Sequence, residues 1–565
     1  MKTYPLFPNR IRHDLNGLWD FTLLEDVAFD DIDPSTITWT DRMVVPSAFD
    51  AYPAYAGKRG AGIYRCFANV APGRRSLLKI GGAGMRCRVW VDGIALAEHI
   101  GTYTPFEVEV EPSDSPRREI VVATDNRFDF DRCPLHEIFF DFHNYGGIIR
   151  QVWLDELSPG MCFRGIRVMV DDENTGEIRL VLNHEGERGN ILVSIDGGAP
   201  VPTNVIRAED GEVELSARVP EPQLWSPAQP RLHTVTASCG EDAVTTRFGL
   251  RRVTAENGRI LVNGAPIKLL GYCRHEAHPQ FGPALPDAQL LADLQILRDL
   301  GCNFIRGSHY QQDPRFLDLC DEMGFLVFSE SLGWGQSEAH FQNEAFAEAQ
   351  LRQTEAMVLA DFNHPSIIVW GFLNEGQSDV ESAVPFYTRM FELIRSLDPS
   401  RLVTSATNRR IKDLMLEQQD VLSFNIYPGW YSWFSKDACD EHPLHEVNEQ
   451  IDTLLRDLAE RGLGDKPVLI SEIGAGAIYG WRDAHHAHWS EEYQRDLLGE
   501  VCRRVVGDDR LCGVALWQFC DCRTYQGGLA LKRPRAFNNK GTLDEYRRPK
   551  LAYDTVRKIF REPRR

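Results

Sequence analysis

Two glutamates end apolar, strand-like segments of the chain, and their carboxyl groups are suited to acid–base and nucleophilic chemistry. Glu375 ends the run SIIVWGFLNE, and Glu472 lies near the end of PVLISEIG. Burying a carboxylate at the end of such a strand is costly unless the group has a partner or a function. Two carboxyl groups that flank a bond are the minimum equipment for glycoside hydrolysis, in which one acts as acid and the other as nucleophile or base. The alternative is that each glutamate is only ion-paired with an arginine such as Arg274 or Arg306.

The elements that carry these glutamates predict a (β/α)8 barrel. After Ile260, strand-like runs alternate with amphipathic helical patterns, such as the one expected over residues 290–300. Eight strands, each followed by an amphipathic segment, fit a closed barrel better than an open sheet. The C-terminal ends of barrel strands share one mouth, so Glu375 and Glu472, after predicted strands four and seven, are expected to face each other there. Hydrolysis with retention would place their carboxyl groups roughly 5 to 5.5 Å apart.

The other polar residues of the predicted barrel also fall at strand ends, and we expect them to line the same cleft. They are Arg274, His275, Glu276, Arg306, Ser308, His309, Glu330, Asn374, Asn425, Tyr427, Trp517 and Gln518. Aromatic rings near such a mouth can stack against sugar rings, although packing in the core is an equally good explanation for each ring. The aromatic candidates are Tyr427, Trp430, Tyr431, Trp433 and Trp517.

Two all-β domains are predicted before the barrel, because 565 residues are too many for one hydrophobic core. Residues 1–160 hold short alternating runs, such as GLWDFTL and RCRVWVDG, which are typical of an antiparallel jelly-roll β-sandwich. Residues 161–254 hold six or seven further runs of this kind, which predict an immunoglobulin-like β-sandwich. The catalytic (β/α)8 TIM barrel then covers residues 255–565.

The chain is acidic, which limits the partners that it can bind. Its 62 Lys and Arg residues against 82 Asp and Glu residues give a net charge of -20, so most of the surface repels nucleic acid and anionic membranes. An anionic ligand would need a local group of positive charges. The loop KRPRAFNNKG supplies one with Lys532, Arg533, Arg535, Asn538 and Lys540, unless it is only a solvated loop.

Neither a cofactor nor a metal is predicted. The 13 cysteines contain no CxxC pair, and His485, His486 and His488 lack metal-ligand spacing, so a surface loop is the better explanation for them. The first residues lack the apolar core of a signal peptide, and no run reaches the roughly 18 apolar residues of a membrane span. We therefore expect a cytoplasmic location.

Several motifs in order along nearly the whole chain resemble glycoside hydrolase family 2. They include GTYTPFEVEV, DFHNYGGIIRQVWL, RFGLRRV, GYCRHEAHPQFG, NFIRGSHY, HPSIIVWGFLNEG, ISEIG and LWQF. The resemblance implies the same three-domain layout and a retaining exo-glycosidase that works by double displacement. In that reaction Glu375 would be the acid/base, Glu472 the nucleophile, and Asn374 a hydrogen-bond partner of the sugar 2-hydroxyl.

Within this family the chain is similar to β-glucuronidases. Asn538, Asn539 and Lys540 match their Asn-x-Lys motif, which binds the sugar carboxylate. The resemblance places further substrate contacts at Asp141, His275, His309, Tyr427, Tyr431, Trp517 and Arg535.

Two departures leave the exact sugar open. Arg533 and Arg535 straddle the position of the familiar arginine, and Pro428 follows Tyr427 where an aromatic residue is common. The first expectation is a β-glucuronide substrate, followed by the C4-epimeric β-galacturonide, a neutral β-galactoside, and a non-catalytic carbohydrate-binding protein. The family also implies a homo-oligomer.

Overall fold

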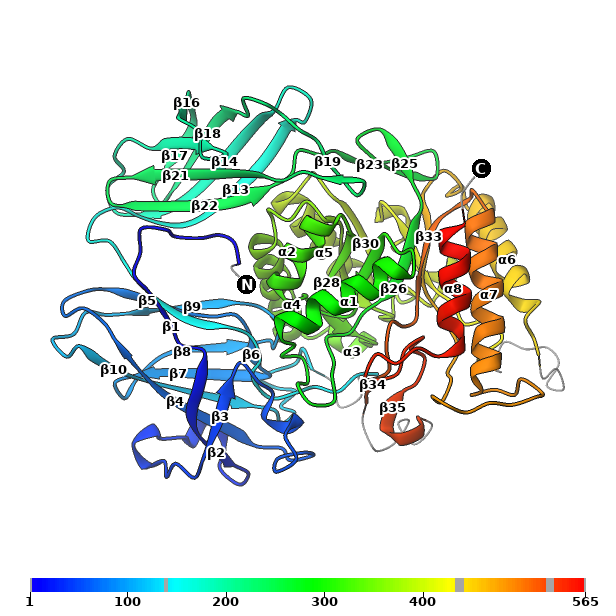
Figure 1. The fold of residues 1–565 in the computed structure, drawn as a ribbon, viewed down its shortest axis with the longest axis horizontal. Coiled ribbons are helices and arrows are strands. Elements are labelled where there is room, and N and C mark those ends of the chain that lie inside the picture. The colour runs from blue at the N-terminus through cyan, green and yellow to red at the C-terminus, as the bar shows by residue number, and fades with distance from the viewer. Residues whose placement is uncertain (1–2, 137–140, 432–441, 525–532, 563–565) are drawn as a thin grey trace.

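The computed structural model describes residues 3–136, 141–431, 442–524 and 533–562. It contains two β-sandwiches that lie against a barrel of parallel strands (Figure 1). This arrangement confirms the predicted fold class of two all-β domains followed by a (β/α)8 barrel. The domain boundaries at residues 160/161 and 254/255 stay predictions.

The first sandwich is built from two antiparallel sheets. One has the strand order β1 (Arg12–Asp14), β12 (Val152–Glu156), β5 (Ser76–Ile80) and β9 (Phe106–Val110). The other has the order β3 (Asp41–Val45), β2 (Gly17–Leu24), β4 (Ala61–Asn69), β10 (Arg117–Asp125), β7 (Arg86–Val91) and β8 (Ile94–Ile100). Alternation decides which face is buried, since Trp19 and Phe21 point into the core while Leu18 is exposed.

The second sandwich is smaller and has the same construction. Its sheets are β13 (Cys162–Asp172), β14 (Glu177–Glu185), β18 (Glu212–Arg218) and β17 (Asn204–Glu209), and β16 (Pro200–Val201), β15 (Leu192–Ile195), β21 (His233–Cys239) and β22 (Asp242–Phe248). A small antiparallel sheet then leads into the barrel through β23 (Val253–Glu256), β24 (Arg259–Val262) and β25 (Ala265–Ile267).

The barrel has eight strands in parallel. In chain order they are β26 (Leu269–Cys273), β27 (Phe304–Gly307), β28 (Leu326–Trp334), β29 (Ile367–Asn374), β30 (Leu402–Ala406), β31 (Leu422–Asn425), β32 (Val468–Ile473) and β33 (Leu511–Leu516). A bridge from Thr407 to Phe424 closes the ring between β30 and β31, since the Asn425 N–H donates to the Thr407 carbonyl at 2.9 Å. The parallel strands bring the polar residues that follow them to one end.

Helices cover the outside of the barrel (Figure 1). They are α1 (Asp287–Asp299), α2 (Pro314–Met323), α3 (Glu338–Phe341), α4 (Glu344–Ala360), α5 (Ala383–Leu397), α6 (Glu446–Glu460), α7 (Glu491–Gly507) and α8 (Leu551–Arg561). Strong end signals fix α2, since the Asp313 side chain accepts a hydrogen bond from the Arg315 N–H and Gly324 ends the helix at φ 75°.

One predicted helix is absent. Residues 407–421, all of which are described, form only two short 3-10 turns, Arg410–Lys412 and Leu416–Gln418, after β30. Between these turns the Asp413 carboxylate accepts hydrogen bonds from the Met415 N–H at 2.7 Å and the Ser378 hydroxyl at 2.8 Å. Such a side chain offers the backbone an alternative to helical hydrogen bonds, so the amphipathic pattern was misleading here.

The first sandwich is anchored to the barrel beside the mouth. Arg150 is buried and donates to the Tyr103 and Gln311 carbonyls and to the Glu276 carboxylate, the last at 3.2 Å. The Tyr103 ring stacks on Tyr310 with centroids 3.8 Å apart. These contacts hold the segment that contains Asp141 next to the barrel strands.

We predict that Leu294→Ala lowers the free energy of unfolding by roughly 3 kcal/mol, because the deleted side chain leaves a cavity in a close-packed core. Leu294 is fully buried on the barrel-facing side of α1. Urea denaturation measures the change. Leu291→Ala on the same helix is the control, since Leu291 is 38% exposed and its loss is expected to cost less than about 1 kcal/mol. Equal losses in the two variants would contradict the packing of α1.

Candidate active site

Glu375 and Glu472 are both placed at the mouth by the ends of barrel strands. Glu375 follows β29 directly, and its N–H donates to the Ala406 carbonyl of β30 at 2.9 Å. Its backbone is left-handed, with φ 55°, a strained conformation for a side chain of this size that is found preferentially at functional sites. Glu472 lies within β32 and is only 3% exposed, whereas Glu375 is half-buried.

A single network of hydrogen bonds joins the two carboxylates. The Asn425 amide donates to Glu375 Oε1 and to Asn374 Oδ1, at 2.9 Å in both cases. Arg306 then donates from Nη2 to the same Asn374 oxygen at 2.8 Å and from Nη1 to Glu472 Oε1 at 2.8 Å. The structure therefore brings the ends of β29, β31 and β32 to one site, as the barrel topology predicted.

Arg306 does form the ion pair that was the structural alternative for Glu472. It is fully buried and also donates from Nε to Glu330 on β28 at 2.5 Å. Arg274 is instead paired with Asp293 of α1, at 3.0 Å. Because Arg306 reaches both Asn374 and Glu472, its structural role is to organise the cleft.

Burial raises the pKa of both glutamates, since the charged form loses its hydration. The negative charge of Glu375 raises the pKa of Glu472 further. The Arg306 guanidinium opposes these effects at Glu472, and so does the Tyr427 hydroxyl, which donates to Glu472 Oε2 at 2.7 Å. The net result is a pKa of Glu472 raised to about 8. The Arg306 charge lowers the pKa of both glutamates, but its guanidinium is hydrogen-bonded to Glu472, whereas Glu375 accepts from the neutral amide of Asn425.

Histidines and aromatic rings form one wall of the site. His309 stacks on Trp517 with ring centroids 5.2 Å apart, and His275 meets the same indole edge-on at 5.4 Å. Phe142, from the first sandwich, lies 4.9 Å from His275. Burial lowers the pKa of His309 to about 4, so its ring is neutral near pH 7. His309 Nε2 lies 3.6 Å from Glu472 Oε1, which places this wall beside the carboxylates.

A buried lysine lies on the other side of Tyr427. Lys540 follows β35 (Phe537–Asn538), is 1% exposed, and donates from Nζ to the Tyr431 hydroxyl at 3.0 Å. Its Nζ lies 5.5 Å from the Tyr427 ring centroid and 5.7 Å from that of Trp430. Burial lowers the pKa of Lys540, and the nearby charge of Arg533 contributes to the same effect. The ammonium thus lies in an aromatic cage, one tyrosine away from Glu472.

Asp141 crosses from the first sandwich to this loop. Its Oδ2 lies 2.5 Å from Arg533 Nη2 and accepts a hydrogen bond from Asn538 Nδ2 at 2.8 Å. Arg535, which the resemblance had named as a substrate contact, has a left-handed backbone at φ 61°. It pairs with Glu545 at 2.9 Å. Of the two arginines, Arg533 is the one that contacts Asp141, and the sequence analysis had named it only as part of the basic loop.

Some candidates lie elsewhere. Trp433 and Lys532 fall outside the described residues. In the histidine run, His486 pairs with Asp496 at 2.5 Å and the ring of His488 packs 4.3 Å from Tyr493. Sequence reasoning had named Asn425 only as a strand-end residue and had missed Phe142 altogether. The place of Asn425 at the end of β31 was the available signal, whereas Phe142 lies in another domain.

The structure also gathers three possible metal ligands that no motif had indicated, Asp318, Asp321 and His364. His364 Nδ1 lies 2.6 Å from Asp321 Oδ2, and Asp318 pairs with Arg247 of the second sandwich at 2.7 Å. Burial acts to lower the pKa of His364, but the charge and hydrogen bond of Asp321, together with the charges of Asp318 and Asp361, outweigh it and raise the pKa to about 9. Together with Arg247, these side chains form a buried network of ion pairs that joins the barrel to the second sandwich.

No helix within the described part of the chain is long and apolar enough to cross a membrane.

Solved structures with the same arrangement cover the whole chain. A β-galacturonidase from Eisenbergiella tayi bound to galacturonate matches with a TM-score of 0.88 and 35% identity over 100% of this chain and 99% of that chain. A β-glucuronidase from Faecalibacterium prausnitzii matches with a TM-score of 0.86 and 26% identity over 98% of each chain.

Comparisons of sequence agree with those of structure. A β-glucuronidase from Streptococcus agalactiae is 27% identical over 98% of this chain and 97% of that protein, and one from Paenibacillus borealis is 28% identical over 87% and 85%. The family model for the TIM barrel domain of glycosyl hydrolases family 2 matches residues 253–562, more than half of the chain, and a second family 2 model matches residues 165–251. The chain belongs to family 2 of the glycosyl hydrolases and is a glycoside hydrolase.

Proposed function

We propose that this chain is a retaining exo-glycosidase that releases terminal β-D-hexuronic acids. The observation that carries the proposal is the position of Lys540. Tyr427 donates a hydrogen bond to Glu472 and presents its ring to the Lys540 ammonium, 5.5 Å away. A sugar whose anomeric carbon lies at Glu472 would thus have a buried cation within reach of its far side.

A uronic acid satisfies this cation better than a neutral sugar does. The lowered pKa of Lys540 reflects an ammonium that has lost water without gaining a full counter-charge, and a bound carboxylate would supply one. The chain has a net charge of -20, so its surface repels a polyanion, whereas this buried cation can attract a single negative group. The names of the relatives support this, since they are β-glucuronidases and a β-galacturonidase.

In the first step, the Glu472 carboxylate attacks the anomeric carbon while Glu375 gives its proton to the glycosidic oxygen, and the bond to the aglycone breaks. In the second step, Glu375 takes a proton from water as the water attacks the anomeric carbon, and Glu472 leaves. The pair must therefore start with one proton, located on Glu375. Mutual repulsion keeps one proton on a coupled pair, and the Arg306 ion pair favours the ionised form of Glu472.

Asn374 is suited to bind the sugar 2-hydroxyl. Its Oδ1 is occupied by Arg306 and Asn425, which fixes the amide so that Nδ2 remains as the donor. That nitrogen is buried and has no hydrogen-bond partner among the described residues. A hydrogen bond to the 2-hydroxyl that strengthens in the transition state would add to catalysis.

A β-D-galacturonide is the second candidate substrate. Its 4-hydroxyl points to the other face of the sugar ring than in a glucuronide, so residues beside the carboxylate site decide between the epimers. Arg533 and Asn538 converge on Asp141 there, and the relative with 35% identity over the whole chain is a β-galacturonidase. The glucuronide is still the first candidate, because most of the relatives are named β-glucuronidases.

We also propose a cytoplasmic, homo-oligomeric enzyme. The twelve described cysteines are all free, which suits a reducing compartment. The oligomeric state rests on the family resemblance, and sedimentation or light scattering would measure it.

We expect nitrophenyl β-glucuronide or β-galacturonide to be cleaved with a kcat/KM at least about 100-fold above that of the β-galactoside, as expected when a buried cation loses its counter-charge. Lys540→Ala should raise KM for the uronide by about 10-fold or more and leave residual galactosidase activity unchanged. Lys466→Ala is the control. Lys466 precedes β32, at the end of the barrel opposite the mouth, and donates to the Leu416, Glu417 and Gln419 carbonyls. A preference for the galactoside would refute the uronide assignment, and the ratio of the two uronides decides the epimer.

Glu375→Ala is expected to lower kcat by about 100-fold or more for substrates with poor leaving groups, because no acid remains to protonate them. With an aryl uronide whose aglycone leaves without protonation, added azide should restore turnover and give a β-glycosyl azide, since azide attacks the glycosyl-enzyme without a general base. Glu472→Ala should form no β-glycosyl azide, because it lacks the nucleophile that makes the glycosyl-enzyme. A 2-fluoro uronosyl fluoride should label Glu472 in the unsubstituted enzyme, and labelling of another residue would overturn the assignment.

The pKa of Glu472 should move in opposite directions in two variants. Glu375→Gln removes the negative charge that raises this pKa and should lower it, whereas Tyr427→Phe removes a hydrogen bond that stabilises the carboxylate and should raise it. The pH dependence of labelling by the 2-fluoro uronosyl fluoride reports the ionised fraction of Glu472, because fluoride leaves without acid assistance. Shifts of the same sign in both variants would contradict the proposed coupling.

A further inference from the structure

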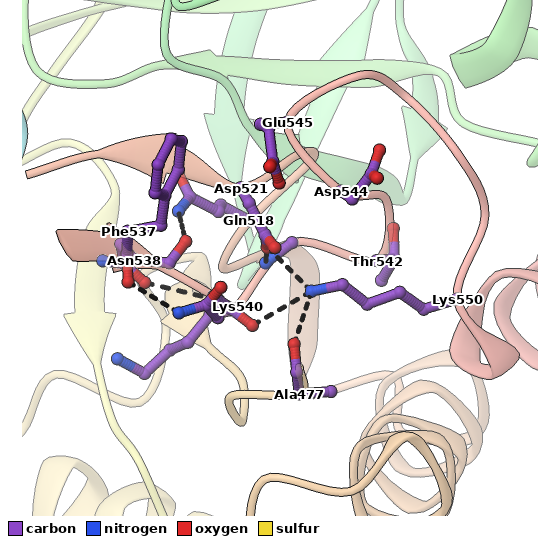
Figure 2. A network of polar contacts seen from close by, with 12 residues as sticks. Ala477, Gln518, Asp521, Phe537, Asn538, Lys540, Thr542, Asp544, Glu545 and Lys550 are labelled. Atoms are coloured by element: carbon purple, nitrogen blue, oxygen red, sulfur yellow. Dashed lines mark hydrogen bonds and ion pairs between the residues drawn. The ribbon is translucent and has the colours of Figure 1, made fainter. Parts of the chain in front are cut away.

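A second lysine, Lys550, lies fully buried behind the loop that carries Lys540. Its Nζ donates to Asp521 Oδ1 at 2.8 Å, to the Ala477 carbonyl at 2.7 Å and to the Asn539 carbonyl at 3.1 Å (Figure 2). The side chains of Lys550 and Asp521 are both 0% exposed. All three donors of this ammonium are therefore used within the protein, which leaves none for a ligand.

The ion pair of Lys550 and Asp521 is hydrogen-bonded to the loop backbone on both sides of Lys540. Lys550 binds the carbonyl of Asn539, one residue before Lys540, and Asp521 Oδ1 accepts a hydrogen bond from the Gly541 N–H, one residue after it, at 2.9 Å. The side chain of Lys540 extends away from Lys550 in Figure 2. Lys550 and Asp521 thus contact the backbone of this loop, on the opposite side from the Lys540 ammonium.

Two glutamines complete the support. The Gln518 N–H donates to the Lys540 carbonyl at 3.0 Å, and its side-chain amide donates to the Asn538 carbonyl at 3.2 Å. Gln494 Nε2 donates to the Gly541 carbonyl at 3.0 Å. Each backbone carbonyl from Asn538 to Gly541 therefore accepts a hydrogen bond from Gln518, Lys550 or Gln494. These bonds fix the backbone of the loop and thereby set the directions of the Asn538 and Lys540 side chains.

Such an arrangement is not explained by stability alone. Replacing a fully buried ion pair with apolar residues of similar volume is often neutral or stabilising, because desolvation offsets most of the attraction. A charged pair does give the loop a directional, multivalent anchor that apolar packing lacks, and binding groups must be held to within about half an ångström.

We propose that Lys550 and Asp521 are positioning residues for the carboxylate-binding loop and thereby determine the preference for uronic acids over neutral sugars. This inference rests on the proposed role of Lys540. Neither residue touches the sugar, and each acts through the Asn539 carbonyl or the Gly541 N–H. Their loss would displace the Lys540 ammonium from the sugar carboxylate and leave the pair formed by Glu375 and Glu472 in place.

The test uses Lys550→Met, which keeps the length of the side chain and removes its charge, and Asp521→Asn, the milder variant. Both should raise KM for the preferred uronide by roughly 10-fold, equivalent to the loss of one or two buried hydrogen bonds, and change kcat by less than about 3-fold. Lys550→Arg should rescue part of the effect. The effect of Lys550→Met should vanish in a Lys540→Ala background, since the two changes act through one group.

Arg401→Met is the matched control. Arg401 is also buried, pairs with Asp398 at 2.5 Å, and donates to the Phe362, His364 and Ile367 carbonyls, but at the start of β30, the opposite end of that strand from the mouth. It should lower the melting temperature and leave KM unchanged.

The outcomes separate the two proposals. If Lys540→Ala raises KM while folded Lys550 and Asp521 variants bind the uronide normally, the positioning role is wrong. Additive effects of Lys550→Met and Lys540→Ala would overturn it as well. If Lys540→Ala itself leaves KM for the uronide unchanged, the proposed function fails first. Should Lys550→Met not fold, Asp521→Asn and Lys550→Arg decide the question by the same measurements.

Discussion

The buried positive charge of Arg306 is the constraint on which the cleft depends. A guanidinium taken out of water is costly unless its donors are satisfied, and here they reach Glu330, Glu472 and Asn374 at 2.5 to 2.8 Å. These partners come from three different strands, β28, β32 and β29, and Arg306 itself lies in β27, one residue before its end. The interactions that compensate the charge are thus the ones that assemble the site. A retaining mechanism benefits because the same guanidinium favours the ionised nucleophile.

The second sugar-binding element is built on a different principle. Among the described residues Lys540 forms no ion pair with a carboxylate. It is surrounded by Tyr427, Trp430 and Tyr431, whose ring faces attract a cation without neutralising it. The neighbouring positive charge of Arg533 is balanced by Asp141. The Lys540 ammonium therefore lies beside the ion pair of Arg533 and Asp141 but outside it, which suits the binding of a ligand with one negative charge.

The first sandwich contributes to the site as well as to the fold. Asp141 and Phe142 reach the barrel mouth, and Arg150 and Tyr103 join the same sandwich to the barrel. Rigid elements hold binding groups more accurately than isolated loops do. Behind the loop, Lys550 and Asp521 have the corresponding function for the barrel side.

Local patterns predicted the elements well where local physics decides them. Alternating runs predicted the strands of both sandwiches. The limits of α2 also depend on local physics, since Asp313 caps its start and Gly324 ends it. The pattern failed after β30, where the Asp413 side chain competes for the backbone. The resemblance named Arg535 and not Arg533 as a substrate contact, and spacing along the chain does not reveal that Arg535 pairs with Glu545 while Arg533 pairs with Asp141.

The sequence by itself therefore determined the three-part fold, the two glutamates at strand ends and a basic loop in an acidic chain, since hydrophobic periodicity and residue type are local properties. Only the tertiary structure decided which partners these groups meet. Arg306 and Glu472 are 166 residues apart, and Asp141 and Asn538 are 397 apart. The energies that set their charge and direction, desolvation and hydrogen bonding, depend on distances in space, and these exist only once the barrel has closed.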